Sequence, residues 1–144
     1  MSRTFVALTL CCAVLTTILM TSQVNADKDN IVTASQVNGT WKNKTGTFKI
    51  HALGKQRLEV SFYGLYKYNS PAGPTANEGE ASGIAFIEGD TATFKPEDTG
   101  EDDCVITLIF AKDRLTVSQE GSGTCGFGHN VRADGTYRKV SGAK

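Results

Sequence analysis

The chain has few of the residues from which metal centres and catalytic sites are commonly built. It contains two histidines, His51 and His129, and its 15 basic residues are balanced by 15 acidic ones. We find no zinc-ligand spacing, no nucleophile elbow and no phosphate-binding loop. The absence of a basic excess gives no support for a nucleic-acid partner. The sequence therefore predicts a protein that is not an enzyme and that holds no metal or cofactor.

The two histidines differ in their predicted settings. His51 falls on the polar side of an expected strand, whereas His129 lies in the loop segment GFGHNV beside Asn130. A loop histidine can act as an acid, a base or a single metal ligand. Without a visible cluster of partners, it more often makes local hydrogen bonds at the surface. We keep His129 as a candidate partner-binding residue.

A long apolar run occurs once, near the N-terminus. Arg3 precedes the run, which extends over residues 5–20, and Val24-Asn25-Ala26 then supplies the small-x-small pattern of a signal peptidase site. We expect residues 1–26 to be a signal peptide and residues 27–144 to form one exported domain, periplasmic or secreted. An uncleaved membrane anchor is the alternative. After cleavage we expect no membrane insertion, because no later stretch is apolar enough.

Cysteine is scarce once that leader is removed. Cys11 and Cys12 lie within the leader, which leaves Cys104 and Cys125. Because export passes through an oxidising compartment, the simplest prediction is a disulfide between them. Closing a loop of this length stabilises a fold by about 3 kcal/mol in the chain-entropy estimate. A free reactive thiol is the alternative.

Strand periodicity dominates the remaining sequence, and no helical repeat is convincing. Alternation of apolar and polar residues is typical of strands with one buried face, and short polar breaks such as Glu88-Gly89-Asp90 favour antiparallel hairpins. The pattern predicts an all-β fold, a single small antiparallel β-barrel of about eight strands. The expected strands are residues 39–43, 47–53, 57–63, 81–88, 91–96, 104–111, 114–119 and 135–139.

Two of these strands are apolar on both faces. We expect the outer side of residues 104–111 to be covered, and residues 81–88 show the same pattern more weakly. The barrel interior is expected to be filled by phenylalanines, namely Phe48, Phe62, Phe86, Phe94 and Phe110.

The two ends of the expected domain carry nearly the same phrase. Residues 37–44 read VNGTWKNK and residues 133–140 read ADGTYRKV. We interpret them as first and last strands that pair and so close the barrel, although a chance echo is the alternative. Trp41 and Tyr137 would then cover the two ends of the barrel, with Arg138 stacked on the indole. The seam would comprise Gly39, Trp41, Gly135, Tyr137 and Arg138.

Three connections are long enough to carry function, namely residues 64–79, 96–103 and 120–133. Tyrosines crowd the start of the first connection, either as anchors for a partner or as a lid over the barrel mouth. Acidic residues fill the second connection, where they serve either as solvated charge or as a patch for a basic partner. Their spacing does not match the known twelve-residue calcium loop. The candidate partner-binding residues are Tyr63, Tyr66, Tyr68, Asp98, Glu101, Asp102 and His129.

The motifs resemble those of known families. Gly39-Thr40-Trp41 on a first strand, with an arginine on the last, is similar to the signature of the calycin barrels. The segments GEASGIA, TATFKPE, CGFGHNV and GTYRK, between Gly79 and Lys139, resemble small exported bacterial proteins of mostly unknown function. In size, export, disulfide and barrel the chain is similar to periplasmic lysozyme inhibitors. Their inhibitory loop motifs are not present here, so the resemblance implies architecture more than activity.

These observations lead to a functional hypothesis with two alternatives. We expect an exported, non-enzymatic binding protein whose partner is a protein, for example a basic one such as lysozyme. One alternative is a calycin-type carrier of a small apolar ligand. The other is an envelope structural protein without a specific ligand.

Overall fold

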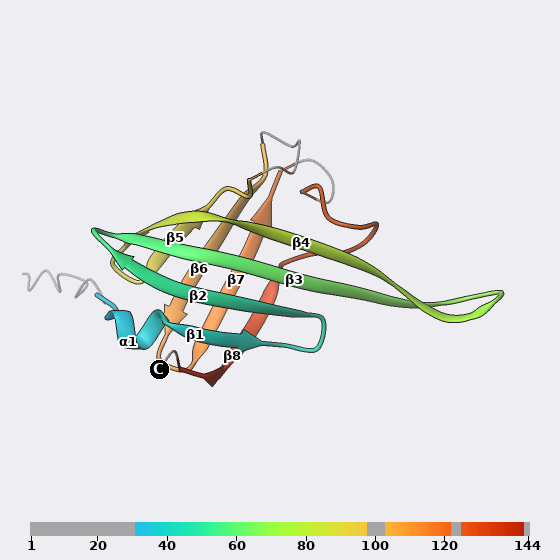
Figure 1. Cartoon of the computed structure of the whole chain (residues 1–144), viewed down its shortest axis with the longest axis horizontal. Helices are drawn as coiled ribbons and strands as arrows, with labels where there is room; N and C mark the ends of the chain where they lie inside the picture. The colour runs from blue at the N-terminus through green and yellow to red at the C-terminus, as the bar shows by residue number, and fades with distance from the viewer. Residues whose placement is uncertain (1–30, 98–102, 122–124, 143–144) are drawn as a thin grey trace, which may run out of the picture.

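The computed structural model describes residues 31–97, 103–121 and 125–142, which form a closed antiparallel barrel (Figure 1). Eight strands follow one another around the barrel in chain order. The elements are α1 (Ala34–Val37), β1 (Gly39–Lys42), β2 (Gly46–Gly54), β3 (Arg57–Ser70), β4 (Gly73–Glu88), β5 (Thr91–Phe94), β6 (Val105–Ala111), β7 (Arg114–Glu120) and β8 (Gly135–Ser141). The all-β barrel predicted from periodicity is confirmed.

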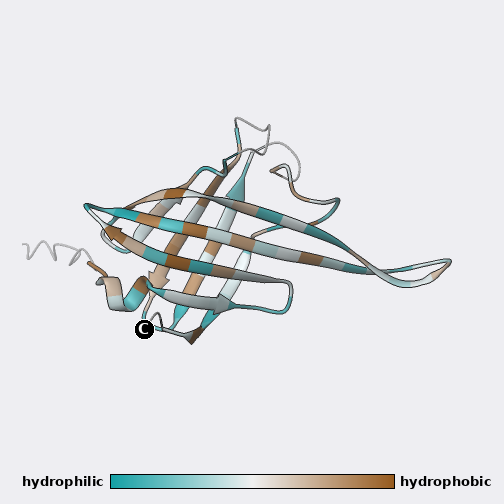
Figure 2. Cartoon of the chain, in the orientation of Figure 1, coloured by the Kyte–Doolittle hydropathy of each residue, from teal (hydrophilic) through white to brown (hydrophobic). Residues whose placement is uncertain are grey.

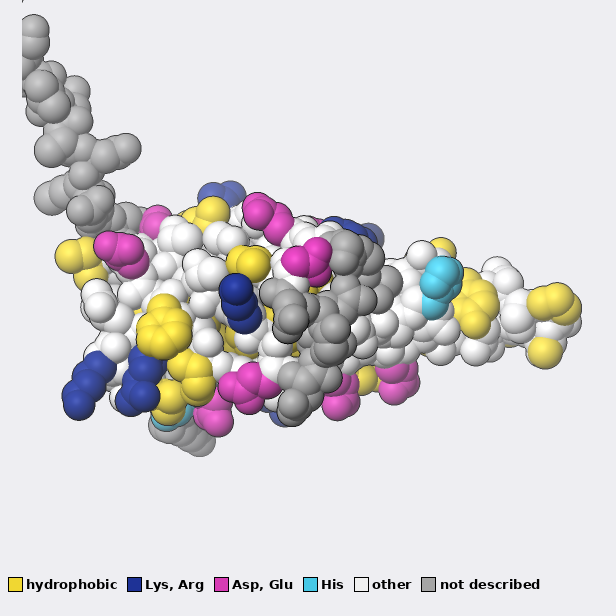
Figure 3. Space-filling view, turned by 90° about the horizontal axis from the view of Figure 1, so that it is seen from above, with side chains coloured by type: hydrophobic (Ala, Val, Ile, Leu, Met, Phe, Trp, Pro, Cys, Tyr) yellow, Lys and Arg dark blue, Asp and Glu magenta, His cyan; other side chains and the backbone are white. Residues whose placement is uncertain are grey.

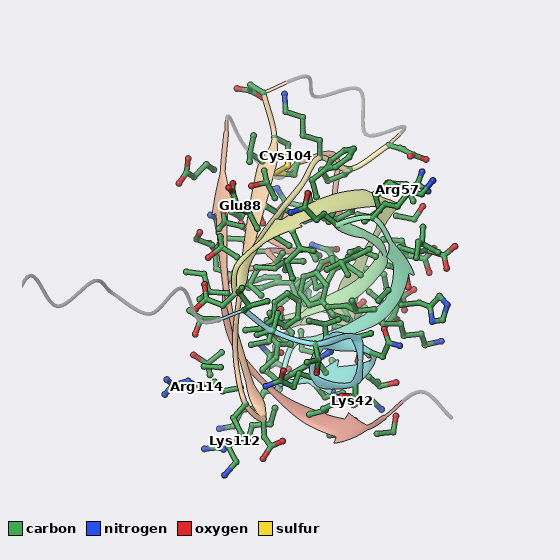
Figure 4. All side chains as sticks on the ribbon, turned by 90° about the vertical axis from the view of Figure 1, so that its left-hand side faces the viewer. Lys42, Arg57, Glu88, Cys104, Lys112 and Arg114 are labelled. Atoms are coloured by element: carbon green, nitrogen blue, oxygen red, sulfur yellow. A yellow bond between two sulfur atoms is a disulfide. The ribbon has the colours of Figure 1, made fainter. Side chains whose placement is uncertain are left out.

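The barrel has an apolar interior because inward-facing, buried positions alternate with solvent-exposed positions along each strand. In β7, for example, Leu115 and Val117 are buried while their neighbours are exposed. This alternation gives the strands their banded colouring in Figure 2, and Figure 4 shows side chains filling the space that the curved strands enclose. The largest fully buried side chains are Trp41, Tyr137, Phe48, Phe94 and Phe110.

The first and last strands pair as the repeated phrase predicted. Trp41 of β1 lies opposite Lys139 of β8, with a register shift between Thr40 and Trp41. Gly39 has φ +133°, and a Cβ there would overlap the carbonyl oxygen of Ser141. The backbone approach at the seam is therefore one that only glycine tolerates.

The predicted stacking of Arg138 on Trp41 is wrong. Lys139 is the residue whose ammonium lies over the indole, at 5.3 Å from the ring centroid. Since Tyr137 points inward, strand alternation also turns Lys139 inward and leaves Arg138 exposed on the outer wall. Trp41 and Tyr137 are both fully buried, and the polar atom of each side chain makes a hydrogen bond to a backbone carbonyl oxygen. The Trp41 Nε1 donates to Val37 O, and the Tyr137 hydroxyl donates to Ala133 O.

Two expectations about the outer wall are also wrong. Phe86 does not fill the interior, because its side chain is 65% exposed, whereas the other four phenylalanines predicted there are buried. In β6, Ile109 is 41% exposed, so the outer side of this strand is not fully covered. Register explains both results, because inward Ala85 and inward Leu108 force their sequence neighbours outward.

The helix α1 was not predicted from the sequence. It is a single turn that the preceding residue stabilises, because the Gln36 Oε1 accepts a hydrogen bond from the Thr33 backbone N–H at 2.7 Å. Val37 is the buried residue of this turn. The Lys139 ammonium donates to the carbonyl oxygens of Ser35 and Gln36, at 2.7 and 2.9 Å, which ties the helix to the seam.

The largest departure from expectation lies in residues 64–79, which were predicted to be a loop. They instead continue β3 and β4 as a long hairpin, paired from Arg57 opposite Phe86 to Ser70 opposite Gly73. Figure 1 shows this hairpin projecting well beyond the barrel. We call residues 65–78 the arm.

The predicted disulfide between Cys104 and Cys125 is present, and both cysteines are buried. It joins the residue before β6 to the segment that follows β7. Residues 125–134, which we call the disulfide loop, run from this bridge to the start of β8 and lie against the base of the arm.

Candidate partner-binding surface

Close contacts at three glycines fix the arm to the disulfide loop. A Cβ at Gly64 would lie 2.8 Å from Val131 Cγ1, and one at Gly79 would lie 2.8 Å from Phe127 Cβ. At Gly128, a Cβ would overlap the carbonyl oxygen of Glu78. None of these positions has room for a larger residue. Side chains of the loop therefore pack directly on the backbone of β3 and β4 at Gly64 and Gly79, and the loop backbone packs on the β4 backbone at Gly128.

A hydrogen bond and a contact between two aromatic rings also join the disulfide loop to the hairpin. The Asn77 side-chain amide donates to the carbonyl oxygen of His129 at 2.7 Å. The Phe127 ring lies 5.2 Å from the Phe62 ring, centroid to centroid. The loop therefore covers the inner face of the hairpin near the barrel, and His129 is exposed where that cover ends.

Beyond the cover, the inner face of the arm carries two stacked tyrosines. Tyr66 and Tyr68 lie 6.0 Å apart between ring centroids, with an interplanar angle of 25°. Their side chains are 40% and 41% exposed, so they do not fold back as a lid over the barrel. Asn77 and Thr75 lie directly opposite them on β4. We call Tyr66, Tyr68, Thr75 and Asn77 the tyrosine face, and Figure 3 shows hydrophobic side chains along the narrow projection.

Tyr63 does not belong to this surface, although the sequence groups it with the other two. It is separated from Tyr66 by an odd number of positions, which places it on the opposite side of the strand. Desolvation raises the pKa of Tyr63, and its hydrogen bond to Glu78 and the charge of Glu80 act in the same direction. Tyr63 is thus engaged with acidic side chains of β4 on the outer face.

The other predicted candidates have different outcomes. Asp98, Glu101 and Asp102 lie outside the residues that the structure describes. His129 lies next to the tyrosine face through its contact with Asn77. Among the described residues, no group of three or more His, Cys, Asp or Glu side chains is placed to hold a metal ion.

Two neighbouring hollows lie on the polar outer wall, over β2, β3 and β4. Their volumes are about 580 and 410 Å³. They share Lys49, Ser61, Ser82 and Glu97, and apolar residues contribute to both linings as well. These hollows are outside the barrel, whose interior is occupied by the buried aromatic side chains.

Sequence reasoning missed Thr75, Asn77 and Gly128. Thr75 and Asn77 became relevant only through their pairing with Tyr68 and Tyr66. A signal for such pairing was the pair of prolines and the turn formers at residues 70–74, which could also have been interpreted as the tip of one long hairpin.

Comparison with known proteins leaves the chain without an identified relative. No family model matches it, and no curated protein and no solved structure is detectably similar to it. In the described part of the chain, no helix has the length and hydrophobicity needed to cross a membrane.

Proposed function

We propose that this protein acts by binding another protein through the tyrosine face of its arm. The observation that carries the proposal is a stacked, half-exposed tyrosine pair held away from the barrel on a two-stranded ribbon. Such a ribbon gains little stability from its own contacts. Tyrosine presents a large, stiff surface with a polar tip, which suits a contact with another protein.

The arm is also ordered in the free protein, before a partner binds. Close packing of the disulfide loop at Gly64, Gly79 and Gly128 fixes its base, and the hairpin is paired as far as Ser70 opposite Gly73. A surface that is already ordered loses less conformational entropy on association. These features support a binding role for the arm in preference to a purely structural one.

A carrier function has less support. In a calycin-type carrier the ligand occupies the barrel interior, but here that space holds Trp41, Phe48, Phe94, Phe110 and Tyr137, all fully buried. A barrel of eight strands is just wide enough for its own side chains to fill it.

Lysozyme is the first partner to test. The resemblance to periplasmic lysozyme inhibitors motivates this choice, together with the shared barrel and disulfide. Lysozymes are basic, and the segment 96–103 is acidic, so the encounter would be favoured at low salt.

The test is a muramidase assay with lysozymes of the c, g and i types at low and moderate salt. We expect inhibition of one class, weakened at least tenfold by the double substitution Tyr66→Ser and Tyr68→Ser. Tyr63→Ser, on the outer face, is the matched control and should inhibit like the unaltered protein. Failure to inhibit any class would remove lysozyme as the partner. Inhibition that the double substitution leaves unchanged would remove the tyrosine face as the contact surface.

A further inference from the structure

The arm has an open backbone edge on β3. The Leu65 N–H donates to Thr45 O at 2.7 Å, away from β4. Because backbone groups alternate in direction along a strand, Lys67 and Asn69 also direct their N–H and C=O groups away from β4. Pairing between β2 and β3 ends at Gly46 opposite Gly64. Within the part of the chain that the structure describes, nothing bonds to the outward backbone groups of Lys67 and Asn69.

The other edge of the arm is protected. The Ser82 carbonyl accepts from Glu97 N, away from β3, so Glu78, Ala76 and Pro74 also face outward on β4. Pro74 has no N–H to offer, and Gly128 lies against the Glu78 carbonyl oxygen. Proline and a covering loop are common means of blocking an edge strand. The β4 edge therefore keeps an outward N–H only at Ala76, between the proline and the loop, and the β3 edge is the better placed of the two for pairing.

We propose that this edge binds the same edge of a second copy of the chain, antiparallel, with the two-fold axis passing beside Tyr68. In this register Lys67 lies opposite Asn69 of the partner subunit, and Asn69 lies opposite Lys67 of the partner subunit. Each of these pairs exchanges both of its backbone hydrogen bonds. The edge is self-complementary because its two outward residues are related by that axis, and no lysine faces another lysine directly.

The dimer would extend the tyrosine face. Strand addition at an edge leaves the faces of a sheet accessible, so the two arms would form one four-stranded sheet. Tyr66 and Tyr68 of both copies would then form a continuous row on its inner face, and each copy alone presents only half of it. Pairing of the arms does not depend on the proposed function, whereas use of the joint face to bind a protein rests on it.

The interface is small, so the dimer is expected to be weak. Pairing of two short edges buries less than a standard protein–protein interface, and such contacts dissociate readily. We expect a dissociation constant on the order of 10⁻⁴ M.

Disulfide trapping tests the register. With Tyr68→Cys the two introduced thiols lie on either side of the axis in a non-hydrogen-bonded pair, within disulfide reach. Thr75→Cys is the matched control, because Thr75 is exposed directly opposite Tyr68 but on β4. Its two copies would be roughly 14 Å apart, three strand spacings, and too far to bridge. Under mild oxidation we expect a covalent dimer from Tyr68→Cys and not from Thr75→Cys.

Sedimentation velocity over a range of concentrations tests the role of the edge without a cysteine. Lys67→Pro removes an outward N–H from the β3 edge, where proline is compatible with a strand. Ala76→Pro makes the same change at the directly opposite residue on the β4 edge. We expect Lys67→Pro to raise the dissociation constant at least tenfold and Ala76→Pro to change it less than twofold.

Several results would overturn the dimer. The first is an unaltered protein that stays monomeric up to about 1 mM, ten times the expected dissociation constant. The second is disulfide trapping that is equal in the two cysteine variants. The third is an equal change of the dissociation constant in the two proline variants. None of these results depends on lysozyme. A dimer that forms as described but binds no lysozyme would leave this inference intact and count only against the proposed partner.

Discussion

Lys139 of the last strand places its ammonium 5.3 Å from the centre of the Trp41 ring on the first strand. The same ammonium donates to two carbonyl oxygens of α1. One side chain thus joins the last strand to the first strand and to α1. Burial lowers the pKa of Lys139, and Asp113 acts in the opposite direction, so desolvation offsets part of the gain from these contacts.

Replacing Lys139 with methionine should therefore destabilise the fold by about 1–2 kcal/mol, because the hydrogen bonds and the cation–π contact are lost while the aliphatic stem remains. Urea unfolding measures the change. Arg138→Met is the control, since Arg138 is exposed on the same strand and should change the free energy of unfolding by less than about 0.5 kcal/mol. Equal effects of the two substitutions would show that Lys139 has no special role at the seam.

Gly128→Ala should loosen the disulfide loop from the arm. The new methyl group would overlap the Glu78 carbonyl oxygen, and relieving an overlap of this kind costs about 1–3 kcal/mol. We expect faster amide hydrogen exchange in residues 126–134. Gly142→Ala serves as the comparison, because a Cβ there meets no atom within 4 Å. Unchanged exchange in Gly128→Ala would mean that the loop is not anchored by this contact.

Removing the disulfide should cost about 3 kcal/mol, since the bridge closes a loop with a sequence separation of 21. The double substitution Cys104→Ala and Cys125→Ala tests this by denaturant unfolding. A folded barrel with lower stability is the expected product, because the barrel is closed by pairing of β1 with β8 and not by the bridge. Loss of less than about 1 kcal/mol would contradict the chain-entropy argument for this loop.

The period of two along the strands was sufficient to predict the barrel. It is a direct consequence of strand geometry, and the paired phrases around Trp41 and Tyr137 identified the seam. The same rule, applied from Tyr137, would have placed Lys139 on the inner side and Arg138 outside. Where both faces of a strand are apolar, as around Phe86, the period does not say which face is inward. Register with neighbouring strands decides it.

The arm could not be predicted in this way. A ribbon beyond the barrel has no core to face, so residues 65–78 show no apolar alternation apart from Tyr66 and Tyr68, and their prolines and glycines are typical of loops. Pairing continues there because the register is already fixed where β3 and β4 pass through the barrel wall. The tyrosine face depends on this continuation, and so does the separation of Tyr63 from Tyr66 and Tyr68.

Alkaline pH should destabilise the protein through Tyr137. Burial raises the pKa of this phenol well above its ordinary value of 10.0, against the opposing effect of a hydrogen bond from Asn43. Because the folded pKa is raised, the contribution to stability is complete below pH 10 and is lost as the unfolded chain ionises above it.

Tyr137→Phe isolates this effect. The variant should be about 1 kcal/mol less stable near pH 8, because it lacks the hydrogen bond to Ala133 O. Between pH 9 and pH 11 the unaltered protein should lose about 1.4 kcal/mol of stability relative to the variant, which is enough to cancel its advantage, since only the unaltered protein has this phenol to ionise on unfolding. Urea unfolding of both proteins across this range measures the difference. A difference that stays constant with pH would mean that Tyr137 ionises as readily in the folded barrel as in the unfolded chain.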